Sequence, residues 1–224
     1  MTFPASSADH QLLERVGANL ARVEERIASS GRDLASVRIV AVTKTFGESE
    51  IRAAVEVGLR DIGENYVDEL CEKRASLNVT TLRWHFLGAL QTNKIARATS
   101  CADVLSGVAR ERELLAIAKH SPGHLVDIQV DYTGEGRRNG AAPHEVAALV
   151  LSARELSLHV RGLMVVAPRG ERATREAFEQ TRDLADELGL VERSMGMSDD
   201  LEIACELGST EVRLGRALFG PRVL

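Results

Sequence analysis

Short apolar segments alternate with helical segments from residue 37 onward, and this alternation constrains the fold more than any other feature. Such alternation predicts a parallel sheet, and eight units of this kind close into a (β/α)8 TIM barrel. The alternative is a doubly wound open sheet, but the first strand leads into TKTFGES rather than into a glycine-rich phosphate fingerprint. The predicted strands are 37–43, 60–65, 82–88, 102–107, 124–131, 158–166, a short strand that ends at SMGMS (194–198), and 210–214.

An amphipathic helix over residues 8–30 precedes the first strand, and Gly31 ends it. Its apolar residues recur at steps of three and four, so they form one stripe: Leu13, Val16, Leu20, Val23 and Ile27. We expect this helix to pack outside the barrel. No proline- or serine-rich linker interrupts the 224 residues, so we expect a single domain over 1–224.

Composition excludes several classes of function. The net charge of −5 provides no overall basic field for nucleic acid or an anionic membrane. No apolar run approaches the roughly 20 residues of a membrane span, and MTFPASSADHQ lacks the pattern of a secretory signal. We therefore expect a cytoplasmic protein, and we take a monomer as the default expectation. Its three cysteines, Cys71, Cys101 and Cys205, lack metal-ligand spacing and are expected to be reduced thiols.

The stretch 191–220 contains two short strands, each followed by a turn of small residues that opens a helix. The first turn ends at Ser198 and the second begins at Gly215. Backbone N–H groups at such helix starts bind phosphate because they are unpaired donors at the positive end of the helix dipole. The last units of a (β/α)8 barrel are a common place for a phosphate.

Lys44 follows the first strand, and it is the residue most suited to covalent chemistry. A lysine in such a place either extends its amine to solvent or uses it, because burying an unpaired amine is costly. Strand eight is next to strand one in a closed barrel, so Lys44 and Gly215 are expected to be neighbours. An amine beside a phosphate site is what pyridoxal 5′-phosphate (PLP) requires. The alternative is another phosphorylated ligand, with Lys44 as a plain cation.

Arg213 precedes the second turn by two residues. If its guanidinium faces the pyridine nitrogen of PLP, that nitrogen stays unprotonated, because arginine does not give up its proton. The alternative is a surface ion pair. The other polar residues at or near predicted strand ends are Glu64, Asn65, His85, Ser106 and Asp131, of which His85 is interpreted as a core side chain and Asn65 as either a turn residue or a site residue. Arg137 and Arg138 are interpreted as a solvated loop.

Several long motifs resemble those of the pyridoxal phosphate homeostasis proteins, whose barrel is similar to the N-terminal domain of alanine racemase. They occur in order over nearly the whole chain: AVTKTF (41–46), IGENYVDE (62–69), WHFLGALQTNK (84–94), GLMVVAP (162–168), SMGMSDDLEIA (194–204) and STEVRLGRALFG (209–220).

The resemblance implies which residues bind the cofactor. It implies that Lys44 holds PLP as a Schiff base, that Ser198 and the backbone at Gly215 and Arg216 hold the phosphate, and that Arg213 faces the pyridine nitrogen. Asn65 and Met164 complete the set beside the cofactor. Arg216 departs from the family, which usually has threonine there, so a hydroxyl contact is lost and a cation is gained.

The resemblance also implies a function: a PLP-binding protein that buffers the cofactor or delivers it to PLP-dependent apoenzymes, without established catalysis. A small PLP-dependent amino-acid racemase is the alternative. Racemisation needs a second acid or base on the opposite face of the cofactor. Tyr66 and Tyr132 are the two tyrosines of the chain, and neither is at a position that matches that role.

Overall fold

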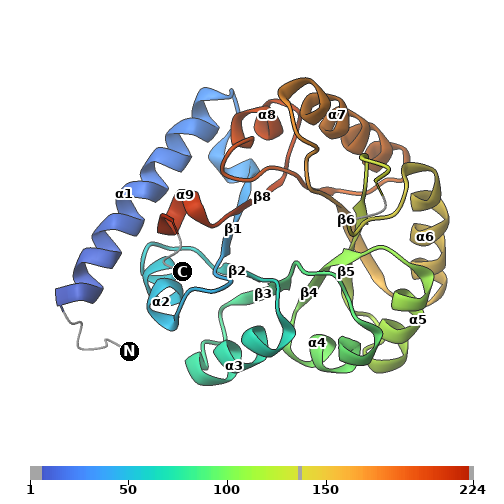
Figure 1. Ribbon diagram of the computed structural model, residues 1–224, viewed down its shortest axis with the longest axis horizontal. Coiled ribbons are helices and arrows are strands. Elements are labelled where there is room, and N and C mark those ends of the chain that lie inside the picture. Colours follow the sequence, from blue (N-terminus) through green and yellow to red (C-terminus); the bar gives the residue numbers. More distant parts are fainter. Residues whose placement is uncertain (1–6, 136–137, 222–224) are drawn as a thin grey trace.

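The computed structural model describes residues 7–135 and 138–221, and within them eight parallel strands close into a barrel ringed by helices (Figure 1). The strands follow the order of the sequence, and β8 pairs with β1. The predicted (β/α)8 fold is therefore confirmed. The strands are β1 (Arg38–Val42), β2 (Asp61–Glu64), β3 (Arg83–Phe86), β4 (Val104–Val108), β5 (Leu125–Val130), β6 (His159–Val165), β7 (Glu192–Ser194) and β8 (Glu211–Leu214).

A helix follows each strand, as the alternation of the sequence predicts, and the expected N-terminal helix over residues 8–30 is present with bounds that differ by one residue at each end. The helices are α1 (Ser7–Ser29), α2 (Glu48–Glu56), α3 (Val67–Leu77), α4 (Ile95–Cys101), α5 (Glu111–His120), α6 (Pro143–Glu155), α7 (Glu171–Glu187), α8 (Leu201–Glu206) and α9 (Arg216–Phe219), with short 3-10 helices η1 (Leu34–Ser36) and η2 (Thr92–Lys94). Pro143 begins α6, a position that suits proline because a first-turn residue needs no N–H partner.

Helix α1 lies outside the barrel, against α2, α8 and α9 (Figure 1). Four residues of its predicted stripe are buried, whereas Leu13 is half-buried and Leu12 occupies the buried position beside it. Arg26 also joins this helix to the end of the chain, because its Nη2 donates to Glu202 Oε2 of α8 at 2.7 Å and to the Ser198 carbonyl at 3.0 Å. The helix therefore supports the connection between β7 and β8 in addition to covering apolar surface.

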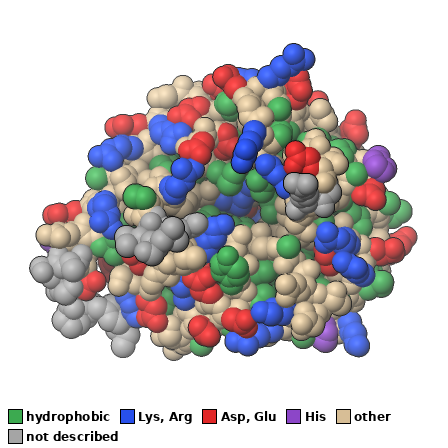
Figure 2. All heavy atoms as spheres, viewed as in Figure 1, with side chains coloured by type: hydrophobic (Ala, Val, Ile, Leu, Met, Phe, Trp, Pro, Cys, Tyr) green, Lys and Arg blue, Asp and Glu red, His purple; other side chains and the backbone are tan. Residues whose placement is uncertain are grey.

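The main apolar core lies between the strands and the helices. Alternate strand residues point out of the barrel and pack against the helices; Ile62, Trp84 and Ile128 are fully buried examples. A smaller apolar cluster surrounds Phe178 of α7. Acidic and basic side chains are interspersed on the face of the molecule in Figure 2, as the small net charge predicts. No helix in the described part of the chain is long and apolar enough to span a membrane.

The inside of the barrel is charged. Arg161 of β6 donates to Asp127 of β5 at 2.7 Å and to Glu211 of β8 at 3.2 Å. Strands β6 and β8 are not neighbours, so these side chains meet across the barrel interior. Arg38 of β1 donates to Glu211 at 3.3 Å. Other polar strand residues bond to one another or to these charges: Asp61, His85, Ser106, Glu192 and Ser194. We call this set, with Arg38, Asp127, Arg161 and Glu211, the interior network.

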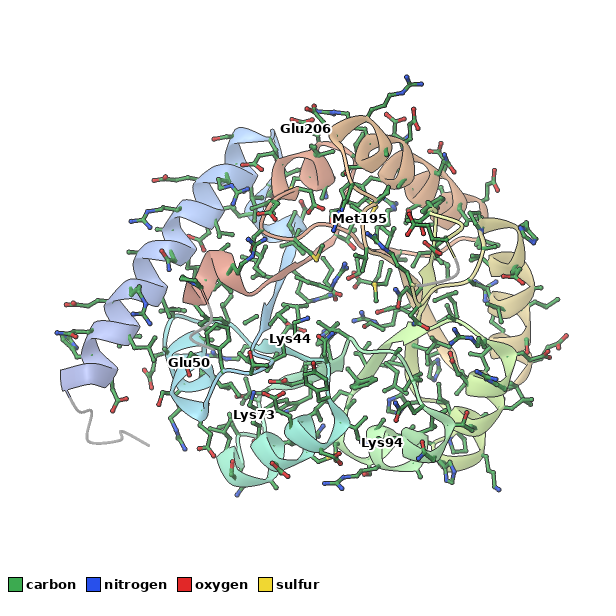
Figure 3. All side chains as sticks on the ribbon, in the orientation of Figure 1. Lys44, Glu50, Lys73, Lys94, Met195 and Glu206 are labelled. Carbon is green, nitrogen blue, oxygen red and sulfur yellow. A yellow bond between two sulfur atoms is a disulfide. The ribbon has the colours of Figure 1, made fainter. Side chains whose placement is uncertain are left out.

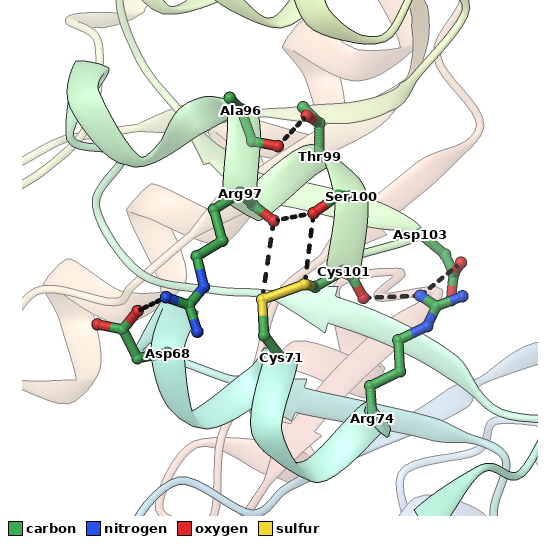
Figure 4. Close-up of a disulfide and its surroundings, with 9 residues drawn as sticks. All are labelled: Asp68, Cys71, Arg74, Ala96, Arg97, Thr99, Ser100, Cys101 and Asp103. Atoms are coloured by element: carbon green, nitrogen blue, oxygen red, sulfur yellow. Dashed lines mark hydrogen bonds and ion pairs between the residues drawn. A yellow bond between two sulfur atoms is a disulfide. The ribbon is translucent and has the colours of Figure 1, made fainter. Parts of the chain in front are cut away.

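A disulfide joins Cys71 of α3 to Cys101 at the end of α4 (Figure 4). The expectation of reduced thiols is therefore wrong for these two residues and holds for buried Cys205. The two helices are neighbours around the barrel, and their Cα atoms are 5.2 Å apart at this point, within the usual range for a disulfide. Arg74 joins the same two elements, because its Nη1 donates to the Cys101 carbonyl at 2.6 Å.

Candidate functional site

One cavity at the carboxyl ends of the strands brings the predicted site residues together. All seven line it: Lys44, Asn65, Met164, Ser198, Arg213, Gly215 and Arg216. The remaining lining residues are Val42, Leu87, Val166, Met197, Asp199 and Asp200. The cavity volume is about 260 Å³. This is slightly below the roughly 300–1,000 Å³ that ligand pockets span, so the cavity suits a small ligand with a single ring.

Lys44 enters the cavity from the turn after β1, and in Figure 3 it lies toward the middle of the ring of helices. The pairing of β1 with β8 places Ala41 opposite Leu214, so the turns that follow the two strands are adjacent. A Cβ built on Gly215 would lie 3.1 Å from the Val42 carbonyl oxygen, which shows how closely the turns approach. The predicted proximity of Lys44 and Gly215 is therefore confirmed.

Arg213 is buried beneath the cavity rather than paired on the surface. Its Nη1 donates to the Ser194 carbonyl at 2.6 Å and to Ser194 Oγ at 2.8 Å, and its Nη2 donates to the Val165 carbonyl at 2.7 Å. Burial lowers the pKa of Arg213, but a guanidinium stays charged at any ordinary pH. The hydrogen bonds to neutral groups fix the side chain and leave its positive charge available to a ligand.

Ser194 connects Arg213 to the interior network. Its Oγ accepts from Arg213 and donates to Glu211 Oε1 at 2.8 Å. Burial opposes ionisation of Glu211, yet the charges of His85 and Arg161 and the Ser194 hydrogen bond lower its pKa to about 2. A charged carboxylate thus lies behind the hydroxyl that holds Arg213. Our sequence reasoning missed this support, although the spacing of Glu211 and Arg213 on one strand already placed both on the same face.

The two small-residue turns, which follow β7 and β8, meet at the cavity. Gly196 has φ of 100°, and a built Cβ would lie 2.5 Å from Ala204 Cβ, so this turn requires glycine. Ser198 Oγ accepts from the Ala217 N–H at 3.1 Å and thereby joins the first turn to α9. The Leu218 and Phe219 N–H groups of α9 donate to the Gly215 carbonyl at 3.0 and 2.9 Å, so the backbone donors that this turn presents to an anion in the cavity are those of Gly215 and Arg216. Arg216 forms an exposed ion pair with Asp199.

The remaining predicted polar residues lie elsewhere. His85 and Ser106 are buried in the interior network, in agreement with the core interpretation of His85. Asp131 accepts from the Thr133 N–H within its own loop. Arg138 lies in a loop but is half-buried and donates to the Ala167 carbonyl at 2.9 Å, so the interpretation of a solvated loop holds only in part for this residue. Arg137 lies outside the described residues.

The chemistry of the lining residues suits a small phosphorylated aldehyde or a similar ligand. The cavity combines one primary amine, one buried guanidinium and a turn of backbone donors. Within the described ranges, no group of three or more His, Cys, Asp or Glu side chains is placed to hold a metal ion. The two tyrosines do not line the cavity: Tyr66 is exposed, and the Tyr132 hydroxyl lies 3.1 Å from Thr181 Oγ1.

Comparison with known proteins gives one consistent family. The family model described as "Alanine racemase, N-terminal domain" matches residues 13–223. A pyridoxal phosphate homeostasis protein from Pseudomonas aeruginosa is 39% identical over 220 residues, which cover 94% of this chain and 96% of that protein. The protein of the same name from Escherichia coli is 36% identical and covers 92% of this chain and 97% of its own length.

Solved structures agree with this assignment. PipY of Synechococcus elongatus, solved with PLP bound, is 33% identical with a TM-score of 0.78 and covers 88% of this chain and all of its own. Alanine racemase from Corynebacterium glutamicum is 15% identical with a TM-score of 0.75, over 94% of this chain and 62% of the enzyme. At that identity the likeness to the racemase concerns the fold alone.

Proposed function

Because the chain belongs to the family of the alanine racemase N-terminal domain, and within it to the pyridoxal phosphate homeostasis proteins, we propose that it binds PLP in the cavity described above. The observation that carries this proposal is the convergence of Lys44, Arg213 and the two small-residue turns on one cavity. These groups match the aldehyde, the pyridine nitrogen and the phosphate of PLP in kind.

Each of the seven predicted site residues has a role in this proposal. The Lys44 amine would hold the aldehyde carbon as a Schiff base, with loss of the aldehyde oxygen as water, and Ser198 with the backbone at Gly215 and Arg216 would hold the phosphate. Arg213 faces the pyridine nitrogen, while Asn65 and Met164 contact the ring. Arg216 can exchange its exposed partner Asp199 for the phosphate, because a surface ion pair is weak.

Bound PLP withdraws electrons from an attached amine and so labilises its neighbouring bonds. Arg213 limits that chemistry, since a permanent guanidinium keeps the pyridine nitrogen unprotonated. No tyrosine lines the cavity to supply the second acid or base of a racemase. We therefore propose that the protein stores PLP or delivers it to PLP-dependent apoenzymes, as a monomer in the cytoplasm, rather than turning over amino acids.

A spectroscopic titration tests PLP binding. Purified protein, Lys44→Ala and Lys44→Arg are each titrated with PLP, and the visible absorbance of a Schiff base is recorded. We expect the band in the wild type alone. Lys44→Arg is the matched control, because it keeps the charge and loses the nucleophilic amine. Equal phosphate-dependent binding by wild type and Lys44→Arg, with no band in either, would show that Lys44 acts as a plain cation and would contradict the proposal.

The loaded protein is then offered a panel of common amino acids. We expect no turnover. Racemisation or decarboxylation at an ordinary enzyme rate, about 1 per second or faster, would favour the enzyme instead.

A further inference from the structure

The turn that carries Lys44 has an unfavourable backbone conformation. The Phe46 N–H donates to the Thr43 carbonyl at 3.0 Å, which closes a four-residue turn with Lys44 second and Thr45 third. Thr45 has φ of 65°. A positive φ at the third position of such a turn is usually supplied by glycine or asparagine, and a β-branched residue there is strained. The turn therefore requires support from outside.

Helix α3 supplies that support at both ends of the turn. Glu69 Oε1 accepts from the Thr45 N–H at 2.7 Å, and Lys73 Nζ donates to the Thr43 carbonyl at 2.7 Å. The two side chains also meet each other, with Lys73 Nζ 2.7 Å from Glu69 Oε1. They are four residues apart and so lie on the same face of the helix. We call Glu69 and Lys73 the α3 clamp.

The position of Lys73 separates this arrangement from an ordinary surface ion pair. Its side chain is only 10% exposed, and its third acceptor is Glu64 Oε1 at 2.7 Å. The three donors of the ammonium thus have three acceptors: Thr43, Glu64 and Glu69. Glu64 in turn accepts from Thr43 Oγ1 at 2.6 Å. Figure 3 shows Lys73 on the side of Lys44 that faces α3.

We propose that Glu69 and Lys73 are positioning residues, which hold the Thr43–Phe46 turn in its strained conformation and so direct the Lys44 amine into the cavity. This inference rests on the proposed function, in which Lys44 is the amine that captures PLP. Neither clamp residue lines the cavity, so each acts through the turn. The clamp also accounts for Lys73 as a buried lysine near the site that does not line the cavity.

A double-mutant cycle tests the clamp. The clamp is proposed to hold Thr45 at a strained positive φ, and glycine at that position would not be strained. The variants are Glu69→Ala, Thr45→Gly and their combination, with Glu72→Ala as a matched control on the exposed side of α3. Three quantities are measured: the rate of PLP capture trapped by borohydride, the mass-mapped acylation rate of Lys44 without PLP, and the thermal unfolding temperature.

We expect Glu69→Ala to slow PLP capture by roughly tenfold to a hundredfold, as small misplacements of reacting groups do. Thr45→Gly in the same chain should restore most of that rate, because glycine adopts the positive φ without support. Glu72→Ala should match the wild type. Two results would overturn the proposal. The first is that Thr45→Gly does not restore the capture rate of Glu69→Ala, as expected if Glu69 only stabilises α3. The second is that Glu69→Ala captures PLP at the wild-type rate.

A substitute variant and the acylation of Lys44 allow the clamp to be tested even if Glu69→Ala does not fold or PLP does not bind. If Glu69→Ala does not fold, Glu69→Gln replaces it, since the amide keeps an acceptor for Thr45 and loses the charge toward Lys73. If the wild type fails to bind PLP, the proposed function fails, but the acylation of Lys44 in the absence of PLP still tests the clamp. An acylation pattern of Lys44 that is the same in all variants would refute the clamp separately.

Discussion

The outer and inner faces of the same eight strands are chemically opposite. Outward residues such as Ile62 and Trp84 pack in an apolar layer beneath the helices. Inward residues such as Asp127, Arg161 and Glu211 form the interior network of buried charges. Apolar burial stabilises a fold without regard to direction, whereas hydrogen-bonded charges fix particular orientations. The outer layer therefore supplies most of the stability of the fold, and the inner layer fixes most of the geometry of the site.

Filling the inside of the barrel with charged side chains costs free energy of desolvation. Desolvation of a buried ion pair offsets most of its attraction, so replacing such a pair by apolar residues is often neutral or stabilising. Here the charges have a visible structural consequence, because Glu211 holds Ser194 and Ser194 holds Arg213. The chain of contacts leads from the barrel interior directly to the cavity.

The largest expected effect comes from opening a cavity in the outer layer. Phe178 is fully buried against Val165, Met195 and Ala204. Phe178→Ala should lower the free energy of unfolding by about 3–5 kcal/mol, because it removes apolar contacts and leaves a void. Urea unfolding measures this, with exposed Arg172→Ala as the control that should show no change. A Phe178→Ala protein as stable as that control would break the assignment of stability to the outer layer.

The inner layer is tested by Glu211→Gln, because its effect on the free energy of unfolding should depend on pH. The folded state lowers the pKa of Glu211 from 4.5 to about 2, so its charge stabilises the fold above pH 4.5, and this contribution is lost as the pH falls through 2. We expect Glu211→Gln to cost on the order of 3 kcal/mol at neutral pH. The cost should shrink on acidification, whereas that of Phe178→Ala should not.

Urea unfolding of both variants at several pH values makes this comparison. Parallel pH profiles for Glu211→Gln and the wild type would contradict the role given to the Glu211 charge.

The smallest expected loss is that of the disulfide, which lies outside both layers. Opening the Cys71–Cys101 bond releases a constraint across 30 residues, and we expect a loss of about 2 kcal/mol, at the lower end of the usual range, because Arg74 still bridges α3 and the end of α4. Thermal unfolding with and without a dithiol measures it. The unfolding temperature of the Cys71→Ser/Cys101→Ser protein should not change with the dithiol. If the dithiol lowers it as much as that of the wild type, the loss of stability does not come from this disulfide.

Sequence alone predicted the outer layer better than the inner one. Apolar runs such as VRIVAVT marked the strands, and the stripe of α1 marked its buried face, because these patterns are local. Asp127 and Glu211 were not foreseen, since a single charge in a short strand does not reveal whether it points toward a partner or toward solvent. Their partners lie on strands far along the chain, and closure of the barrel brings them together.

The candidate site divides in the same way. Turn chemistry and the family resemblance identified seven of the thirteen residues that line the cavity, because these seven lie at or near strand ends. The α3 clamp carries no such signal: Glu69 and Lys73 look like an ordinary helical ion pair until Thr43 and Thr45 are placed against them. The disulfide was missed for the same reason, since only the packing of α3 against α4 brings its cysteines together.

The central claim is that one amine, that of Lys44, captures PLP. The most direct measurement is borohydride reduction of the PLP-loaded protein, followed by mass mapping of every lysine peptide. We predict a single reduced adduct on Lys44, and none on clamped Lys73 or on Lys94, which is paired with Asp68 at the surface. A reduced adduct on another lysine with Lys44 unmodified, or no adduct in protein saturated with PLP, would contradict the claim.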